Sequence, residues 1–189
     1  MSTIESPIVT IPGYVAGTWK LDPIHTHIGF SAKHMMVAKV RGRFTEFEGT
    51  IVTAPDPLAS TAVVTIQASS IDTNQEFRDN HIRSADFFDA DNHPTITFAL
   101  HRLRPHDDGF AVEGELTMRG ITKPITLTMD TPAIAPTGDG STKAGFSMTG
   151  DIDRHAWGVS YDGPIPGGGT MIGSRVQLVL DVEADLQPA

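Results

Sequence analysis

The chain has 189 residues, of which 39% are hydrophobic and 20% charged, values typical of a folded globular domain with a substantial core. It carries 14 Lys and Arg residues against 23 Asp and Glu residues, a formal net charge of −9. This balance argues against a nucleic-acid partner, because nucleic-acid binders carry a basic patch or stripe. The absence of cysteine excludes disulfides, thiolate metal sites and cysteine nucleophiles.

The first 20 residues contain Glu5 and two prolines and have no basic region before an apolar run, so we expect no secretory signal. No later apolar run is long enough to cross a bilayer, and we expect no stable membrane insertion. These features predict a cytoplasmic protein. No linker or repeat divides the chain, so we expect an N-terminal extension over residues 1–17 and a single domain over residues 18–187.

Alternation of apolar and polar residues is the main pattern along the chain, and it predicts about eight strands. The last strand is the clearest, because its even-numbered residues from Val176 to Leu186 are apolar and its odd-numbered residues, apart from Val179, are polar. In chain order, the expected strands cover residues 27–36, 42–52, 63–69, 95–103, 109–118, 124–130, 144–152 and 175–186.

Short clusters of Pro, Asp and Gly separate these strands at residues 54–57, 105–109 and 136–141. Connections of this length favour antiparallel neighbours. Because every strand has one apolar face, the pattern predicts an all-β fold with one buried sheet face, as in a barrel or a sandwich. A further turn is expected around Gly120 and Pro124.

Residues 73–94 break the alternation, since their apolar residues recur at roughly helical intervals. Asn74 is a candidate N-cap, and Pro94 lies beyond the far end. We expect a helical excursion between the third and fourth strands, covering one end of the sheet structure.

Three histidines lie close together near the start of the chain. His25 and His27 are two residues apart, so on a strand both leave one face, an arrangement that some zinc sites use. No other histidine has a spacing that nominates it as a third ligand, and we expect structural roles for both and no metal site. His34 shares the opposite face with Ile28 and Phe30, which makes it a candidate polar residue in the interior.

Two other segments have a functional and a structural interpretation. Residues 78–88 combine Arg78, Asp79 and His81 with two phenylalanines, which fits a clamp for a polar head group, an acid–base pair, or a capped helix with paired charges. Residues 162–173 are glycine-rich but lack the phosphate-binding fingerprints, so they form either a turn into the last strand or a gate at a barrel mouth. Trp19 and Trp157 are expected to be core or barrel-closing residues.

Four blocks of the sequence resemble the YceI-like family. They are residues 17–51, residues 70–98, residues 114–129, and "RHAWGV" at 154–159 followed by residues 172–186. The resemblance runs from about Trp19 to Leu186 with the blocks in order. Two departures stand out. Many members are exported, whereas we expect no export signal here, and His25 matches a family position whereas His27 does not.

The resemblance implies an elongated, lipocalin-like, eight-stranded antiparallel barrel around an apolar cavity. Members of the family hold polyisoprenoid chains, including prenylated quinones or alcohols, and are often dimeric. The resemblance therefore implies a non-enzymatic binding protein for a long isoprenoid or similar lipid (a prenyl quinone, a polyprenyl alcohol or a polyprenyl phosphate), a possible homodimer, and no cofactor. An eight-stranded barrel is just wide enough for one narrow ligand.

The inward faces of the strands supply the expected ligand contacts. They are Ile28, Phe30, Ala32, His34, Met36, Val64, Ile66, Ile96, Phe98, Val112, Leu116, Leu127, Phe146, Met148, Leu178 and Leu180. The candidates for a polar mouth are Arg78, Asp79, His81 and Arg154. Two alternatives stay open: a metal-dependent enzyme or metalloprotein that uses the barrel histidines, and a stress-related interaction protein with an incidental cavity.

Overall fold

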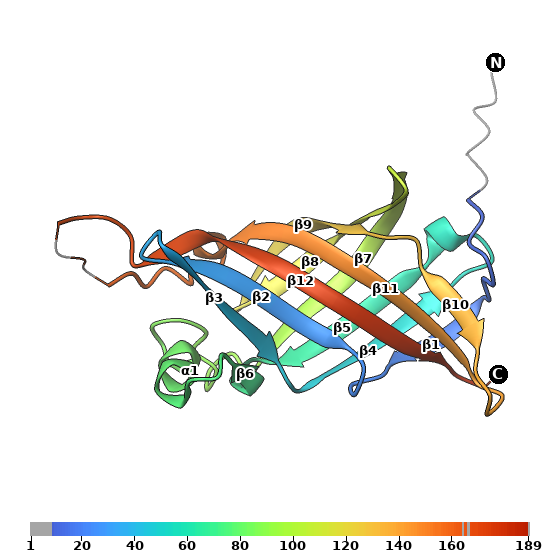
Figure 1. Ribbon diagram of the computed structural model, residues 1–189, viewed down its shortest axis with the longest axis horizontal. Coiled ribbons are helices and arrows are strands. Elements are labelled where there is room, and N and C mark those ends of the chain that lie inside the picture. The colour runs from blue at the N-terminus through green and yellow to red at the C-terminus, as the bar shows by residue number, and fades with distance from the viewer. Residues whose placement is uncertain (1–8, 164, 166, 189) are drawn as a thin grey trace, which may run out of the picture.

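Strands make up most of the protein, and a computed structural model describes residues 9–163, 165 and 167–188 (Figure 1). Residues 1–8 of the expected extension lie outside this part. The strands are β1 Gly17–Leu21, β2 His27–His34, β3 Ala38–Phe44, β4 Phe47–Thr53, β5 Thr61–Gln67, β6 Ile71–Asp72, β7 Thr95–His106, β8 Gly109–Met118, β9 Ile121–Met129, β10 Ala133–Pro136, β11 Thr142–Asp153 and β12 Ile172–Leu186. The helices are α1 Glu76–Arg83 and the short 3₁₀ turns η1 Pro57–Ala59, η2 Ala68–Ser70 and η3 Arg154–Trp157.

These strands close into an antiparallel barrel. β12 pairs with β11 on one side, and on the other side with β1 at one end and β2 at the other. β3 pairs with β2 and β4 pairs with β1, so β3 and β4 together occupy one strand position of the barrel. β9 and β10 both pair with β11 and together occupy another. Counting β1/β2, β3/β4, β5/β6 and β9/β10 as single interrupted strands, the barrel has eight strands, which confirms the expected all-β, lipocalin-like fold.

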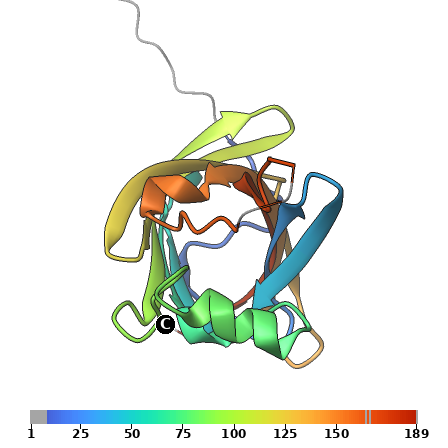
Figure 2. The ribbon, with the colours of Figure 1, turned by 90° about the vertical axis from the view of Figure 1, so that its left-hand side faces the viewer.

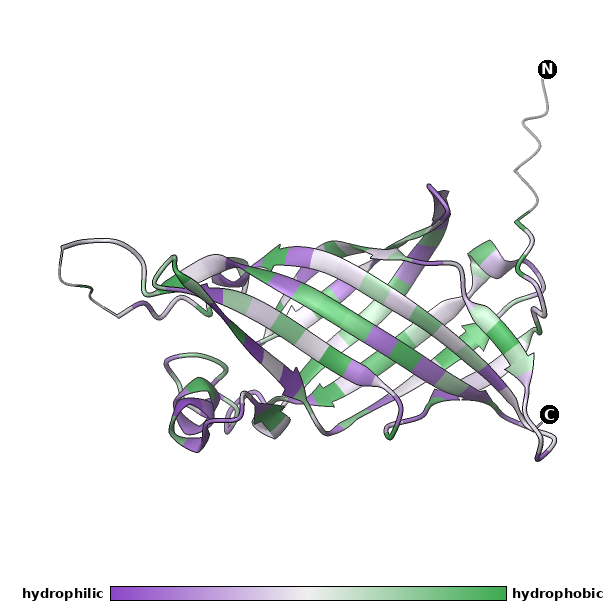
Figure 3. Ribbon diagram, in the orientation of Figure 1, coloured by the Kyte–Doolittle hydropathy of each residue, from purple (hydrophilic) through white to green (hydrophobic). Residues whose placement is uncertain are grey.

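The alternation found in the sequence sets which side chains face inward. In β12, Leu178 lies opposite Phe30 of β2, and Leu180 lies opposite Met148 of β11. Along β12, apolar and polar residues alternate on either side of the apolar run Leu178–Leu180 (Figure 3). Because side chains alternate between the two faces of a strand, this register lines the interior with apolar groups.

The helical segment is shorter than expected. α1 covers Glu76–Arg83, and Gln75 is its N-cap, since the Gln75 Oε1 accepts a hydrogen bond from the Arg78 backbone N–H at 2.6 Å. The expected N-cap, Asn74, instead has a left-handed φ of 60°. α1 lies between β6 and β7 and runs across one side of an end of the barrel (Figure 2). No helix of the described ranges is long and apolar enough to span a bilayer.

Two further details of the strand pattern differ from expectation. Residues 42–52 do not form one strand, because β3 ends at Phe44 and β4 begins at Phe47. Pro124 lies inside β9 opposite Glu115, and the preceding turn is made by Arg119 and Gly120, both with positive φ. Proline is tolerated there because β9 pairs only with β8 at this point, and its pairing with β11 is confined to Thr128 and Met129.

The opposite end of the barrel is covered by the start of the chain. Ile11 is buried there, and the Tyr14 hydroxyl donates to the Ala54 carbonyl oxygen at 2.7 Å and lies 3.2 Å from the Ser60 Oγ. Residues 9–16, expected to be an extension, thus pack against the barrel beside η1 and β10 (Figure 1).

Candidate functional site

A cavity of about 570 Å³ runs through the barrel. Its size falls within the roughly 300–1,000 Å³ typical of small-molecule sites. The inward side chains Phe30, Phe98, Leu178 and Leu180 are only half-buried, because in the middle of the barrel they face this space instead of one another. The interior is therefore a hollow apolar tube and not a filled core.

Most of the residues predicted to face the interior do line the cavity. They are Ile28, Phe30, Ala32, His34, Val64, Ile66, Ile96, Phe98, Val112, Leu116, Leu127, Phe146, Met148, Leu178 and Leu180. That they contact a ligand stays a prediction. The period of two residues located them because each lies on a regular strand.

Met36 is the exception, and its predicted place in the cavity is wrong. β2 ends at His34, and Met35 and Met36 turn the chain with φ values of 51° and 60°. The turn breaks the alternation of the strand, so the Met36 side chain is exposed to solvent instead of facing inward.

Sequence reasoning missed part of the wall. Val176, Val182 and Met129 lie on strands whose alternation already indicated them. Trp19 also lines the cavity, from β1, and its indole N–H donates to the Thr53 Oγ1 at 2.9 Å. Ile11 lines the cavity too, although it lies outside the strands, where no periodic signal exists. The other tryptophan, Trp157, is buried as expected.

No carboxylate of the described residues lines the cavity, whereas five basic residues do. They are Lys33, Arg78 and Arg154, which carry a positive charge, and the histidines His34 and His81. They come from the end of β2, from α1 and from η3, which lie at the same end of the barrel (Figure 1). We call this end the mouth; cationic side chains line the cavity there, in a protein whose net charge is −9.

Arg154 is the most deeply placed of these residues, with 4% of its surface exposed. Its guanidinium donates to the carbonyl oxygens of Val159 at 2.6 Å, Tyr161 at 3.0 Å, Ile172 at 2.9 Å and Gly173 at 3.0 Å. Burial lowers the pKa of this guanidinium. No carboxylate of the described residues forms an ion pair with Arg154, so its charge is balanced by carbonyl dipoles and by the more distant charges of Asp162 and Asp153.

Arg78 also lies at the mouth, whereas the prediction that Asp79 lies there is wrong. Arg78 donates to the Oγ1 of Thr73 at 2.7 Å and to its carbonyl oxygen at 2.8 Å. The Asp79 carboxylate is buried beneath α1, where it accepts the Thr73 backbone N–H at 3.0 Å and the Thr73 hydroxyl. Asp79 therefore holds the start of the helix and does not line the cavity.

His81 lies between an acid and two aromatic rings. Its Nε2 is 2.8 Å from the Asp86 Oδ2, and its ring makes edge contacts with Tyr161 and Phe87 at centroid distances of 4.8 and 5.1 Å. This packing holds the imidazole at the rim of the cavity.

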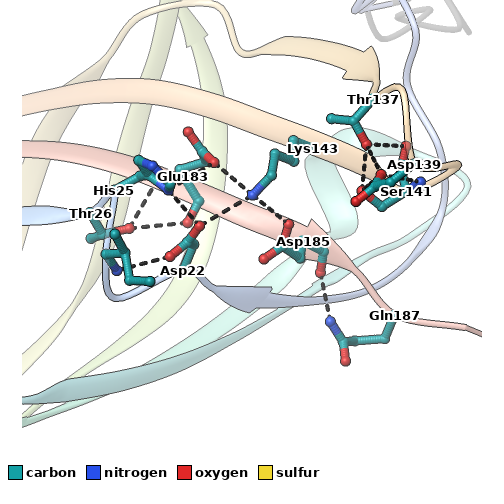
Figure 4. Close-up of polar contacts among 11 residues, drawn as sticks. Asp22, His25, Thr26, Thr137, Asp139, Ser141, Lys143, Glu183, Asp185 and Gln187 are labelled. Carbon is teal, nitrogen blue, oxygen red and sulfur yellow. Dashed lines mark hydrogen bonds and ion pairs between the residues drawn. The ribbon is translucent and has the colours of Figure 1, made fainter.

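His25 and His27, considered from the sequence as metal ligands, lie on the outside of the barrel. His25 contacts Asp22 at 2.8 Å and Glu183 at 3.5 Å, a set of groups close enough to hold a metal ion (Figure 4). However, the Lys143 ammonium lies 3.2 Å from Asp22 and 2.7 Å from Glu183. A lysine already supplies the positive charge that these carboxylates require, so the geometry is that of an ion-pair network.

Protonation in this network follows from its hydrogen bonds. The His25 contact lowers the pKa of the Asp22 carboxyl, and the Asp22 carboxylate raises the pKa of the His25 imidazole. The carboxylates of Asp185 and Glu183 raise the pKa of Lys143. His27 is exposed nearby on the same outer face.

Several known proteins are similar to this chain in sequence and in fold. A UPF0312 protein of Staphylococcus aureus (strain USA300) is 34% identical over 164 residues, covering 86% of this chain and 94% of its own, and one from Staphylococcus epidermidis is 32% identical over 167 residues, covering 87% and 95%. A crystal structure of a Campylobacter jejuni YceI protein has 28% identity and a TM-score of 0.70, covering 82% of this chain and 90% of its own.

Two more distant structures share the fold alone. Burkholderia cenocepacia BcnA has 21% identity and a TM-score of 0.73, covering 86% of this chain and 98% of its own. A polyisoprenoid binding domain from Saccharophagus degradans has 14% identity and a TM-score of 0.65, covering 89% and 98%. The model of the YceI-like domain matches residues 19–184. The chain therefore belongs to the YceI-like family.

Proposed function

We propose that this protein binds and carries a long isoprenoid or similar lipid, such as a prenyl quinone, a polyprenyl alcohol or a polyprenyl phosphate, and catalyses no reaction itself. The observation that carries the proposal is the cavity of about 570 Å³, with aliphatic and aromatic walls and all of its charged lining residues at one end. The polyisoprenoid binding domain from Saccharophagus degradans, which shares the fold, supports the same ligand class.

The driving force comes from removing the chain from water. Each buried CH₂ group contributes roughly 0.8 kcal/mol, so several isoprene units supply a large gross gain. Ordering the chain offsets part of that gain. Apolar contacts discriminate poorly between chains of similar width, so selectivity arises from the length of the tube and from the basic groups at the mouth.

Mass spectrometry of organic extracts from the purified protein, before and after incubation with added prenyl chains, tests the proposal. Val64 and Val63 are neighbours on β5, but Val64 lines the cavity and Val63 is exposed on the outer wall. We expect Val64→Trp to block uptake and Val63→Trp to leave it unchanged. Equal uptake by both variants, or a wild-type protein that takes up no chain, would contradict the proposal.

The homodimer and the cytoplasmic location expected from the sequence stay predictions. Light scattering of the purified protein tests the first, and fractionation of cells that express the protein at native level tests the second.

A further inference from the structure

One segment of this acidic protein contains no acidic residue. Residues 23–45 carry Lys33, Lys39, Arg41 and Arg43 and no Asp or Glu, although the whole chain has a net charge of −9. The hairpin of β2 and β3 lies within this segment, and its turn lies at the same end of the barrel as α1 (Figure 1).

The turn of this hairpin is built from residues that are unfavourable there. Met35 and Met36 have φ values of 51° and 60°, in the left-handed region that Asn, Asp and Gly normally fill in hairpin turns. Methionine has no side-chain group that stabilises this backbone. Folding of the hairpin alone therefore gives no reason for two methionines at these positions.

The same residues leave apolar surface in water. Met36 is 64% exposed and Val37 is 91% exposed, and Phe77 of α1, at the same end, is 81% exposed. Phe77 also lines the cavity together with Lys33 and His34. The exposed apolar side chains thus border the mouth, and clustered apolar surface of this kind marks an interaction site.

Basic residues flank this apolar tip. Lys33, Lys39 and Arg41 form no ion pair with any residue in the described ranges. Two of the nearby carboxylates already have partners, since Asp72 pairs with Arg43 and Asp151 pairs with Arg175. An apolar tip between unpaired cations matches a bilayer surface with anionic head groups, where apolar side chains enter the interface and cations meet the head groups.

We propose that the hairpin tip, residues Met35–Val37 with Lys33, Lys39 and Arg41 on its flanks, docks the mouth of the barrel onto anionic bilayers. In this pose the mouth faces the membrane, so a chain passes between bilayer and cavity without crossing water. This last consequence rests on the proposed lipid-binding function; the docking itself does not.

Flotation of the full-length protein with vesicles tests the docking. We expect binding to vesicles of phosphatidylcholine with one third phosphatidylglycerol, and little binding to phosphatidylcholine alone. The double variant Met35→Asn/Met36→Gly keeps a favourable turn, so it should fold with an equal or higher melting temperature and yet lose vesicle binding. Val63→Ser, which removes an exposed apolar side chain from the barrel wall, is the matched control and should bind as the wild type does.

A charge reversal tests the electrostatic part. Lys39→Glu should weaken binding roughly tenfold, because each basic side chain near an anionic surface contributes severalfold and the new carboxylate is repelled. Lys20→Glu makes the same change of charge at an exposed position of β1, which lies at the other end of the barrel, and should change binding little.

Several results would overturn docking: no vesicle binding by the wild type, equal binding by the double variant, or a tip whose substitution only dissociates a dimer in light scattering. Measuring lipid content on the same samples separates this proposal from the proposed function. A protein that floats but holds no chain supports docking and contradicts the carrier function. A protein that holds a chain but does not float contradicts docking alone.

Discussion

The Arg154 Nη1 donates to the Val159 carbonyl oxygen at 2.6 Å inside the wall of the mouth. The same guanidinium reaches the carbonyl oxygens of Ile172 and Gly173, so one side chain joins the segment after η3 to the start of β12. The glycine-rich stretch between these points is thereby fixed at both ends. The two interpretations of this stretch, a turn into the last strand and a gate at the mouth, stay predictions.

Arg154→Met should therefore destabilise the protein. Several buried carbonyl oxygens lose a charged donor at once, and we expect a loss of about 3 kcal/mol in the free energy of unfolding, measured by urea denaturation. Arg175→Met is the control, because Arg175 forms an exposed ion pair with Asp151 and its removal should change stability little. Equal effects of the two substitutions would contradict the structural role of Arg154.

Asp79→Ala should also destabilise the protein without reducing lipid uptake. The buried carboxylate accepts the backbone N–H and the hydroxyl of Thr73, and its loss leaves both donors unsatisfied, which costs about 2–3 kcal/mol. Urea denaturation measures the stability, and mass spectrometry at a temperature where the variant is folded measures the uptake. A loss of lipid uptake by the folded variant would instead indicate that Asp79 lies at the mouth.

The regular strands could be predicted from the sequence because a period of two residues directly determines which side chains face inward. Leu178 and Leu180 are correctly placed for this reason. The prediction for Met36 is wrong because a turn ends the alternation of β2 after His34, and two methionines do not indicate a turn in the sequence. Asp79 is misplaced because a sequence does not reveal whether a carboxylate lies on the cavity side of a short helix or beneath it.

The closed end of the barrel could not be predicted at all. Ile11 and Tyr14 lie in a proline- and glycine-containing segment without periodicity, and their positions depend on contacts with η1 and β10, which are distant in sequence. Such contacts are set by the assembled barrel and leave no local pattern.

Ile11→Ala should open this end. The side chain is 7% exposed and packs against residues of the barrel interior, so its truncation should cost about 3 kcal/mol in the free energy of unfolding. The enlarged space should also shift the bound lipid toward longer chains in mass spectrometry. Val15→Ala, in the same segment but with an exposed side chain, should alter neither property.

The contact between His25 and Asp22 predicts a pH-dependent contribution to stability. Because the folded pKa of His25 lies above its usual value of 6.5, the contribution is complete below that value and is lost as the pH rises through the folded pKa. The lowered pKa of Asp22 affects stability in the acidic range instead. The contribution of Asp22 to stability is complete above pH 3.8 and is lost as the pH falls through the lower folded pKa.

The difference in melting temperature between the wild type and His25→Asn should therefore be clear at about pH 6 and shrink by about pH 9. His27→Asn is the matched control, because His27 lies on the same outer face and forms no ion pair with any described residue, so its substitution should leave the contact between His25 and Asp22 in place. An NMR titration of the His25 ring should give a midpoint above 6.5 that returns toward that value in Asp22→Asn. A His25 midpoint at or below 6.5 in the wild type would show that the ion pair does not form in solution.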